Sequence, residues 1–181
     1  MSKRILVIAI VLFLGAILLL NMYFQGQSVP LDEVSLTLGD LEDEGYEEFD
    51  KEYITEPYIA PSGTLFEGWN FLEKYHVRFS KNDSCFIVID IGKLTSKDKC
   101  KEFISTIKNT TFYGYYFTEL ESETIGEESY MGENIKTASE VTIYFIVFRI
   151  DNVVVALVSS GHTKETSINY AKIIENNILS N

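Results

Sequence analysis

Histidine and cysteine are scarce in this chain, and their scarcity argues against several kinds of chemistry. The sequence has two histidines and two cysteines in 181 residues. His76 and His162 are far apart in the sequence, so neither a zinc site nor a catalytic histidine is expected. Cys85 and Cys100 form no Cys-x-x-Cys pair, which argues against redox chemistry and again against zinc.

The same two cysteines raise the question of a disulfide. An oxidising compartment would allow a bond between Cys85 and Cys100. Cys85, however, begins an expected strand, and Cys100 lies near the start of the expected helix that follows it. A helix packing back antiparallel over that strand would hold the two thiols too far apart to bond. We therefore expect two free thiols on apolar faces, with a disulfide as the alternative.

Basic residues are also few compared with acidic ones. The chain has 15 lysines and arginines against 27 aspartates and glutamates, and its net charge at pH 7 is −12. Such a chain should repel nucleic acid and anionic lipid headgroups, and it should attract cations or basic partners. No nucleic-acid partner is expected.

Polar side chains are absent from one long segment, Ile5 to Leu20. As a helix these residues span roughly 24 Å, and residues 22–24 extend it towards the bilayer core of about 30 Å. Because Lys3 and Arg4 precede the segment, the positive-inside rule places the N-terminus in the cytoplasm and the rest of the chain outside. We expect residues 1–24 to be a transmembrane signal anchor that contacts the membrane through residues 5–24. The alternative is a cleaved signal peptide and a secreted protein, although Gly26-Gln27-Ser28 matches a cleavage site poorly.

The remaining pattern predicts an α+β domain. Residues 25–33 are polar and indicate a short tether, which leaves residues 34–181 as one extracytoplasmic domain. Strands are expected at 35–38, 75–80, 85–91, 112–120, 141–150 and 153–159, and helices at 96–108 and 163–179. Residues 40–56 indicate an acidic connector, and residues 121–139 a long exposed loop. Together with the transmembrane helix, these elements predict an antiparallel sheet with two flanking amphipathic helices.

A hairpin near the C-terminus is the clearest local prediction. Asp151 and Asn152 separate two strongly apolar strands, and both residue types tolerate the positive φ that a two-residue turn requires. The register then places Ile150 opposite Val153 and Phe148 opposite Val155.

The acidic connector resembles the start of a calcium-binding loop. Asp40, Glu42 and Glu44 alternate, and Gly45 is sixth in the series. The twelfth position is Lys51, where such a loop needs a bidentate glutamate. We expect a solvated connector without a cofactor, and Ca²⁺ held by Asp40, Glu42 and Glu44 is the alternative.

Glu127 and Glu128 are adjacent carboxylates that could act as an acid–base pair or contact a ligand. Catalysis needs two carboxyl groups aimed at one point, whereas neighbours in an extended segment point to opposite sides. We expect a loop or strand edge here and assign no catalytic residue. The sequence Ser159-Ser160-Gly161-His162 lacks the Gly-x-Ser-x-Gly pattern of a hydrolase and indicates the end of a strand.

Three further positions are candidate surface sites. Asn82 and Asn109 each begin an Asn-x-Ser/Thr acceptor sequence in an expected turn, where a glycan could be attached. Trp69 could be an exposed aromatic that recognises a partner, although a lone tryptophan is more often part of a core.

Two short motifs carry a resemblance. Residues 125–129 (Ile-Gly-Glu-Glu-Ser) and 147–155 (Val-Phe-Arg-Ile-Asp-Asn-Val-Val-Val), behind an N-terminal anchor, resemble exported, membrane-anchored archaeal and bacterial domains of unknown function. Those domains carry Gly-Asp-Glu-Ser or Gly-Asp-Glu-Ala, so Glu127 departs from their pattern. The likeness covers about residues 70–180. At the level of fold the chain is similar to PsbP-like and Mog1-like domains, which implies an antiparallel sheet with flanking helices and no catalytic residue.

These observations predict a non-enzymatic module that binds a protein, an envelope component or a small ligand near the membrane. The alternatives are an extracytoplasmic hydrolase that uses Glu127 or Glu128, and an acidic cation-binding domain.

Overall fold

The computed structural model describes residues 29–41, 45–61, 66–108, 117–136 and 141–181. Residues 31–181 form one compact unit, and everything below concerns that unit. The expected membrane anchor, residues 5–24, lies outside the described residues. Within the described ranges, no helix combines the length and the hydrophobicity needed to cross a membrane.

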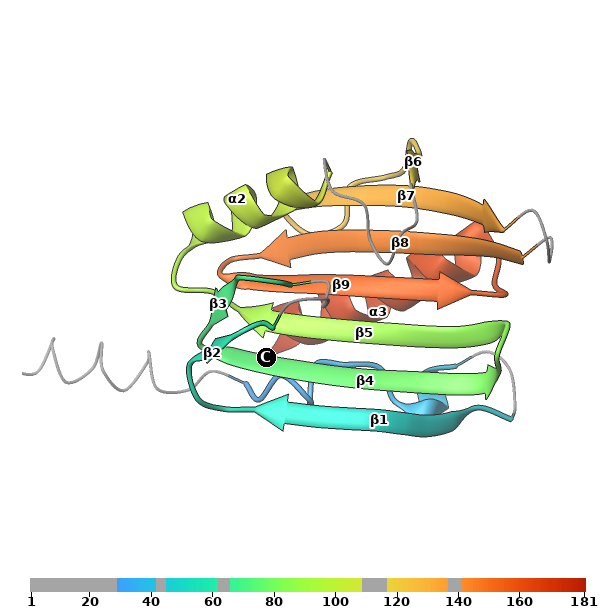
Figure 1. Cartoon of the computed structure of the whole chain (residues 1–181), viewed down its shortest axis with the longest axis horizontal. Helices are drawn as coiled ribbons and strands as arrows, with labels where there is room; N and C mark the ends of the chain where they lie inside the picture. The colour runs from blue at the N-terminus through green and yellow to red at the C-terminus, as the bar shows by residue number, and fades with distance from the viewer. Residues whose placement is uncertain (1–28, 42–44, 62–65, 109–116, 137–140) are drawn as a thin grey trace, which may run out of the picture. The chain divides into compact units, whose positions relative to one another are not determined.

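A seven-stranded antiparallel sheet dominates the unit, in the order β1-β4-β5-β9-β8-β7-β6 (Figure 1). A separate pair, β2-β3, is also antiparallel. The elements are the 3-10 helix η1 (Leu38–Asp40), β1 (Glu47–Ile54), β2 (Tyr58–Ile59), β3 (Asn70–Phe71), β4 (Glu73–Asn82), β5 (Cys85–Lys93), α2 (Lys97–Ile107), β6 (Thr118–Glu119), β7 (Glu128–Lys136), β8 (Val141–Ile150), β9 (Val153–Ser160) and α3 (Lys164–Ser180). The predicted α+β class, with a large antiparallel sheet and two helices, is confirmed.

The two helices cover opposite faces of the sheet. We call the face beneath α2 the α2 face; there the helix residues Phe103 and Ile104 join Phe145 and Val147 of β8 in one buried cluster. On the other side, which we call the α3 face, Ser167 of α3 donates a hydrogen bond to Ser159 of β9 across 3.1 Å. Figure 1 shows α3, in red, passing behind the strands. Side chains therefore alternate between two covered faces, which explains the nearly continuous apolar runs of β5, β8 and β9.

Several local predictions are confirmed. In the β8–β9 hairpin, Ile150 pairs with Val153 and Phe148 with Val155, and Asp151 adopts the positive φ of 55° that the turn requires. Ser96 caps α2 by accepting a hydrogen bond from the Lys99 N–H, as a polar residue at this position should. Thr163 caps α3 in the same way.

Three local predictions are wrong. Residues 35–38 form no strand, because the Thr37 N–H and hydroxyl both donate to the Asp40 carboxylate and turn the chain into η1. The acidic connector contains β1, an edge strand whose first six residues are exposed, so its acidic side chains remain in water while its backbone pairs with β4. The expected loop at 121–139 contains β7, which pairs with β8 from Glu128 to Lys136.

Candidate functional site

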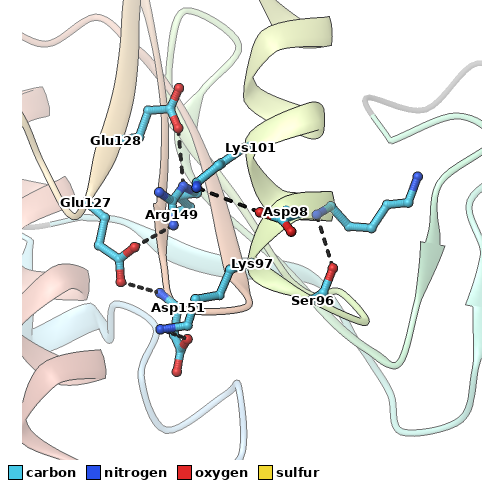
Figure 2. Close-up of polar contacts among 9 residues, drawn as sticks. Ser96, Lys97, Asp98, Lys101, Glu127, Glu128, Arg149 and Asp151 are labelled. Carbon is cyan, nitrogen blue, oxygen red and sulfur yellow. Dashed lines mark hydrogen bonds and ion pairs between the residues drawn. The ribbon is translucent and has the colours of Figure 1, made fainter.

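The sequence motifs at residues 125–129 and 147–155 meet in space around Arg149. Arg149 lies on the α2 face of β8 and is 5% exposed. Its Nη1 donates to Glu127 across 2.5 Å, and its Nε donates to Glu128 across 3.2 Å (Figure 2). Both carboxylates thus bind the same guanidinium. The expected loop or strand edge is confirmed, because Glu127 precedes β7 and Glu128 begins it. The opposite directions of neighbours in an extended segment therefore do not apply to this pair.

Backbone contacts bring the two motifs together. Gly126 has a φ of +67°, and a β-carbon there would lie 2.4 Å from the Arg149 carbonyl oxygen. Only glycine accepts this conformation and this approach without strain. The next N–H, from Glu127, donates to that same carbonyl across 2.9 Å. The Glu127 carboxylate also accepts the Asp151 N–H of the hairpin turn, across 3.1 Å.

Both helices are attached to this arrangement. Lys97 of α2 forms an ion pair with Asp151 across 2.6 Å, and Glu175 of α3 accepts the Gly126 N–H across 2.6 Å. We call Lys97, Glu127, Glu128, Arg149 and Asp151 the Arg149 cluster. It connects the start of β7 to the β8–β9 hairpin and to α2, so the residues of the two motifs have a structural role here.

The contacts within the Arg149 cluster favour the charged forms of Glu127 and Arg149. The hydrogen bond from the Asp151 N–H, followed by that from Arg149, lowers the pKa of Glu127. Burial opposes the charge on Arg149, but hydrogen bonds and charge from both glutamates outweigh it and raise the pKa of Arg149. A general acid needs a raised carboxyl pKa at neutral pH, so this geometry disfavours acid–base catalysis by Glu127.

Both histidines are held in polar networks. His76 Nδ1 and Asp90 lie 3.0 Å apart, and that hydrogen bond raises the pKa of His76 despite its partial burial. His162 contacts the hydroxyls of Ser159 at 2.8 Å and Tyr46 at 2.5 Å. Ser159 is fully buried beneath α3 and cannot meet a substrate from solvent. The interpretation of residues 159–162 as the end of a strand is confirmed, because β9 ends at Ser160.

The two cysteines are free thiols, as expected. Cys100 lies in the α2 core cluster, where burial raises the pKa of its thiol to about 12. Cys85 is half-buried, and its sulfur lies 2.9 Å from the Tyr46 hydroxyl. The raised pKa of Cys100 disfavours a nucleophilic thiolate there.

The other predicted site residues are dispersed. Trp69 is half-buried and packs edge-on against Phe103, with 5.0 Å between ring centroids, beside a cleft of about 340 Å³. Asp40 accepts the hydrogen bonds that begin η1. Asn82 lies in the exposed β4–β5 turn, where its side-chain oxygen accepts the N–H groups of Ser84 and Cys85. Glu42, Glu44 and Asn109 lie outside the described residues.

No cluster of three histidine, cysteine or acidic side chains within the described residues could hold a metal ion. The roles expected for Trp69, Asn82 and the acidic loop stay predictions.

Sequence analysis did not single out Arg78 of β4. Its guanidinium carbon lies 5.0 Å from the ring centroid of Phe86 and 5.9 Å from that of Phe49. It lines a cleft of about 500 Å³ where β1 begins and β4 turns into β5. The alternation of Lys74, His76 and Arg78 was the signal that could have found it, because such spacing places three basic groups on one strand face.

Taken together, these features define an α+β domain whose antiparallel sheet is covered on both faces. No protein-family model matches the chain, and no curated protein matches it in sequence. Among solved structures it is similar to the extracellular domain of PknH from Mycobacterium tuberculosis, with a TM-score of 0.64 and 11% sequence identity. The alignment covers 86% of this chain and 99% of that domain. At this identity the likeness shows the fold alone.

Proposed function

We propose that this chain is an extracytoplasmic binding module without enzymatic activity, held at the membrane by residues 5–24 through the tether at residues 25–33. The likeness to the extracellular domain of PknH supports an extracytoplasmic role, because it covers nearly all of that domain. The apolar segment and the basic residues before it support the anchor and its orientation.

The observation that carries the non-enzymatic part is the Arg149 cluster. Glu127 and Glu128, the best candidates for an acid–base pair, are both bound to one buried guanidinium. A hydrolase would need at least one of them free and raised in pKa. The proposed module therefore binds a protein, an envelope component or a small ligand, and the acidic surface disfavours nucleic acid.

Topology is tested by adding protease to intact cells that carry the full chain with a C-terminal tag. We expect the tag to be lost without lysis and to survive in cells that express a variant lacking residues 5–20. Loss of the tag only after lysis would contradict an extracytoplasmic domain.

Binding is tested by crosslinking intact membranes and isolating the full chain, with the same deletion variant as the control. We expect an envelope protein that copurifies with the full chain and is lost with the deletion. Measurable ester, peptide or glycoside hydrolysis that disappears in Glu127→Gln would contradict the non-enzymatic role and support the hydrolase alternative.

A further inference from the structure

Three basic side chains line up on the α2 face of β4, and among the described residues two of them have an anionic partner. Lys74 and His76 both bind Asp90 of β5, at 3.2 Å and 3.0 Å. Arg78 is two residues further along the same row, opposite Val88. Its Nε is buried and has no hydrogen-bond partner among the described residues. A buried donor without an acceptor is costly. Because Arg78 also lines a cleft, a ligand there could supply the anion that the described residues do not.

Two aromatic rings hold Arg78 in position. Phe86 comes from β5 and Phe49 from the edge strand β1, and both lie within cation–π distance of the guanidinium. Phe49 is 61% exposed, which is unusual for so large an apolar side chain. The arrangement leaves an apolar surface in contact with solvent directly beside a fixed positive charge.

An open cleft gives a ligand access to this group. The cleft of about 500 Å³ is lined by Gly45, Phe49, Ser80 and Asn82, by the basic residues Arg78 and Lys81, and by the acidic residues Glu47 and Asp83. This volume is within the range of small-molecule sites, which is about 300–1,000 Å³. The cleft lies at the end of the sheet where β1 begins and where β4 turns into β5, on the right in Figure 1.

The chemistry of the cleft selects a class of ligand. A guanidinium presents paired donors that match the two oxygens of a carboxylate. Arg78 and Lys81 in the cleft lining are balanced by Glu47 and Asp83, and the net charge of −12 disfavours anions of higher charge, such as phosphate. The exposed ring of Phe49, which lines the cleft beside Arg78, favours an apolar body next to the anionic group.

We propose that this cleft binds a small ligand with a single carboxylate on an apolar body, and that Arg78 anchors the carboxylate. The inference rests on the proposed function and names a ligand class for the binding module. It does not depend on the membrane anchor, so it can fail while the protease and crosslinking results stand.

The test is a titration of the full chain in detergent with phenylacetate, followed by calorimetry. Phenylacetamide has the same shape without the charge, and inorganic phosphate has charge without the apolar body. We expect saturable binding of phenylacetate and at least about tenfold weaker binding of the other two, since a charge-assisted hydrogen bond contributes that much. Equal affinity for phenylacetate and the amide, or tighter binding of phosphate, would overturn the proposed ligand class.

Variants locate the site. Arg78→Gln should weaken phenylacetate binding at least about tenfold, and Phe49→Ala, which alters an exposed side chain, should weaken it severalfold. Lys101→Gln removes the same charge from an exposed position on α2 that pairs with Asp98, and it should change nothing. Unchanged affinity in Arg78→Gln with intact thermal unfolding, or no saturable binding up to about 10 mM, would overturn the site. If Arg78→Gln fails to fold, Phe49→Ala and the amide comparison decide.

Discussion

Arg149 and Arg78 lie on the same face of one sheet and have opposite surroundings. Arg149, on the inner strand β8, is 5% exposed and binds two carboxylates. Arg78, next to the edge strand β1, is held by two aromatic rings and has a buried donor with no acceptor in the part of the chain that the structure describes. The charge of Arg149 is neutralised by carboxylates of the fold itself, and removing it would leave both of them without their cation. Arg78 lines an open cleft without such a partner among the described residues, so it can bind an anion there.

The largest effect is expected at the glycine that lets Glu127 reach Arg149. Gly126→Ala combines a φ of +67° with a contact of 2.4 Å to backbone, so it should lower the free energy of unfolding by about 3 kcal/mol. Urea unfolding of the full chain in detergent measures this. Gly68→Ala is the matched control, because its φ is +78° but nothing lies within 4 Å of its β-carbon. It should cost about 1 kcal/mol. If both variants lost the same free energy of unfolding, the close contact between residue 126 and the Arg149 carbonyl would not contribute to the effect.

A smaller effect on stability is expected when each of the two arginines is replaced by methionine. Arg149→Met removes the cation that both glutamates bind, and we expect a loss of about 2 kcal/mol. The usual cost of breaking a buried pair is reduced here because Glu127 and Glu128 are partly exposed and regain water. Arg78→Met keeps the apolar stem between the rings and should cost only about 0.5 kcal/mol. The urea midpoints of the two variants, measured in parallel, test this difference. A larger loss of stability for Arg78→Met would contradict the structural role given to Arg149.

The smallest effect is a difference in pH dependence. The pKa of Glu127 is lowered from its ordinary value of 4.5, so its stabilising contribution is present above that value. It is lost as the pH falls through the lower pKa of the folded state. Glu127→Gln should therefore lose less stability than wild type when urea midpoints are compared between about pH 5 and pH 3. Arg78→Met should keep the wild-type dependence; a flattened curve there would reveal a carboxylate partner for Arg78.

The sequence predicted the centre of the sheet well and its edges poorly. The β8–β9 hairpin was predictable to the register because its turn residues and both apolar strands agree. β1 and β7 were missed because their sequences are polar or mixed. β1 is one edge strand of the sheet, and β7 lies near the opposite edge, where the two-residue strand β6 is its outer neighbour. Such strands form because their backbone pairs with a neighbouring strand. Their side chains show little of the apolar alternation from which a strand is predicted.

The candidate site was also predicted only in part from the sequence. Residues 125–129 and 147–155 were singled out as motifs, but their contact was not predictable, because they are about 20 residues apart and meet through the β7–β8 pairing. The loop or strand edge expected at Glu127 and Glu128 is present, but their shared contact with Arg149 could not be predicted from the sequence. Arg78 was missed because its cleft is assembled from the start of β1 and the β4–β5 turn.

By itself the sequence determined the acidic charge, the apolar segment expected at the membrane, the α+β class, the capped helices and the central hairpin. These depend on composition or on contacts between residues close along the chain, where propensity and periodicity act. Only the tertiary structure decided which charges are neutralised. Whether an arginine lies against two carboxylates or between two rings depends on the pairing and order of the strands, and these follow from burying both faces of the sheet together.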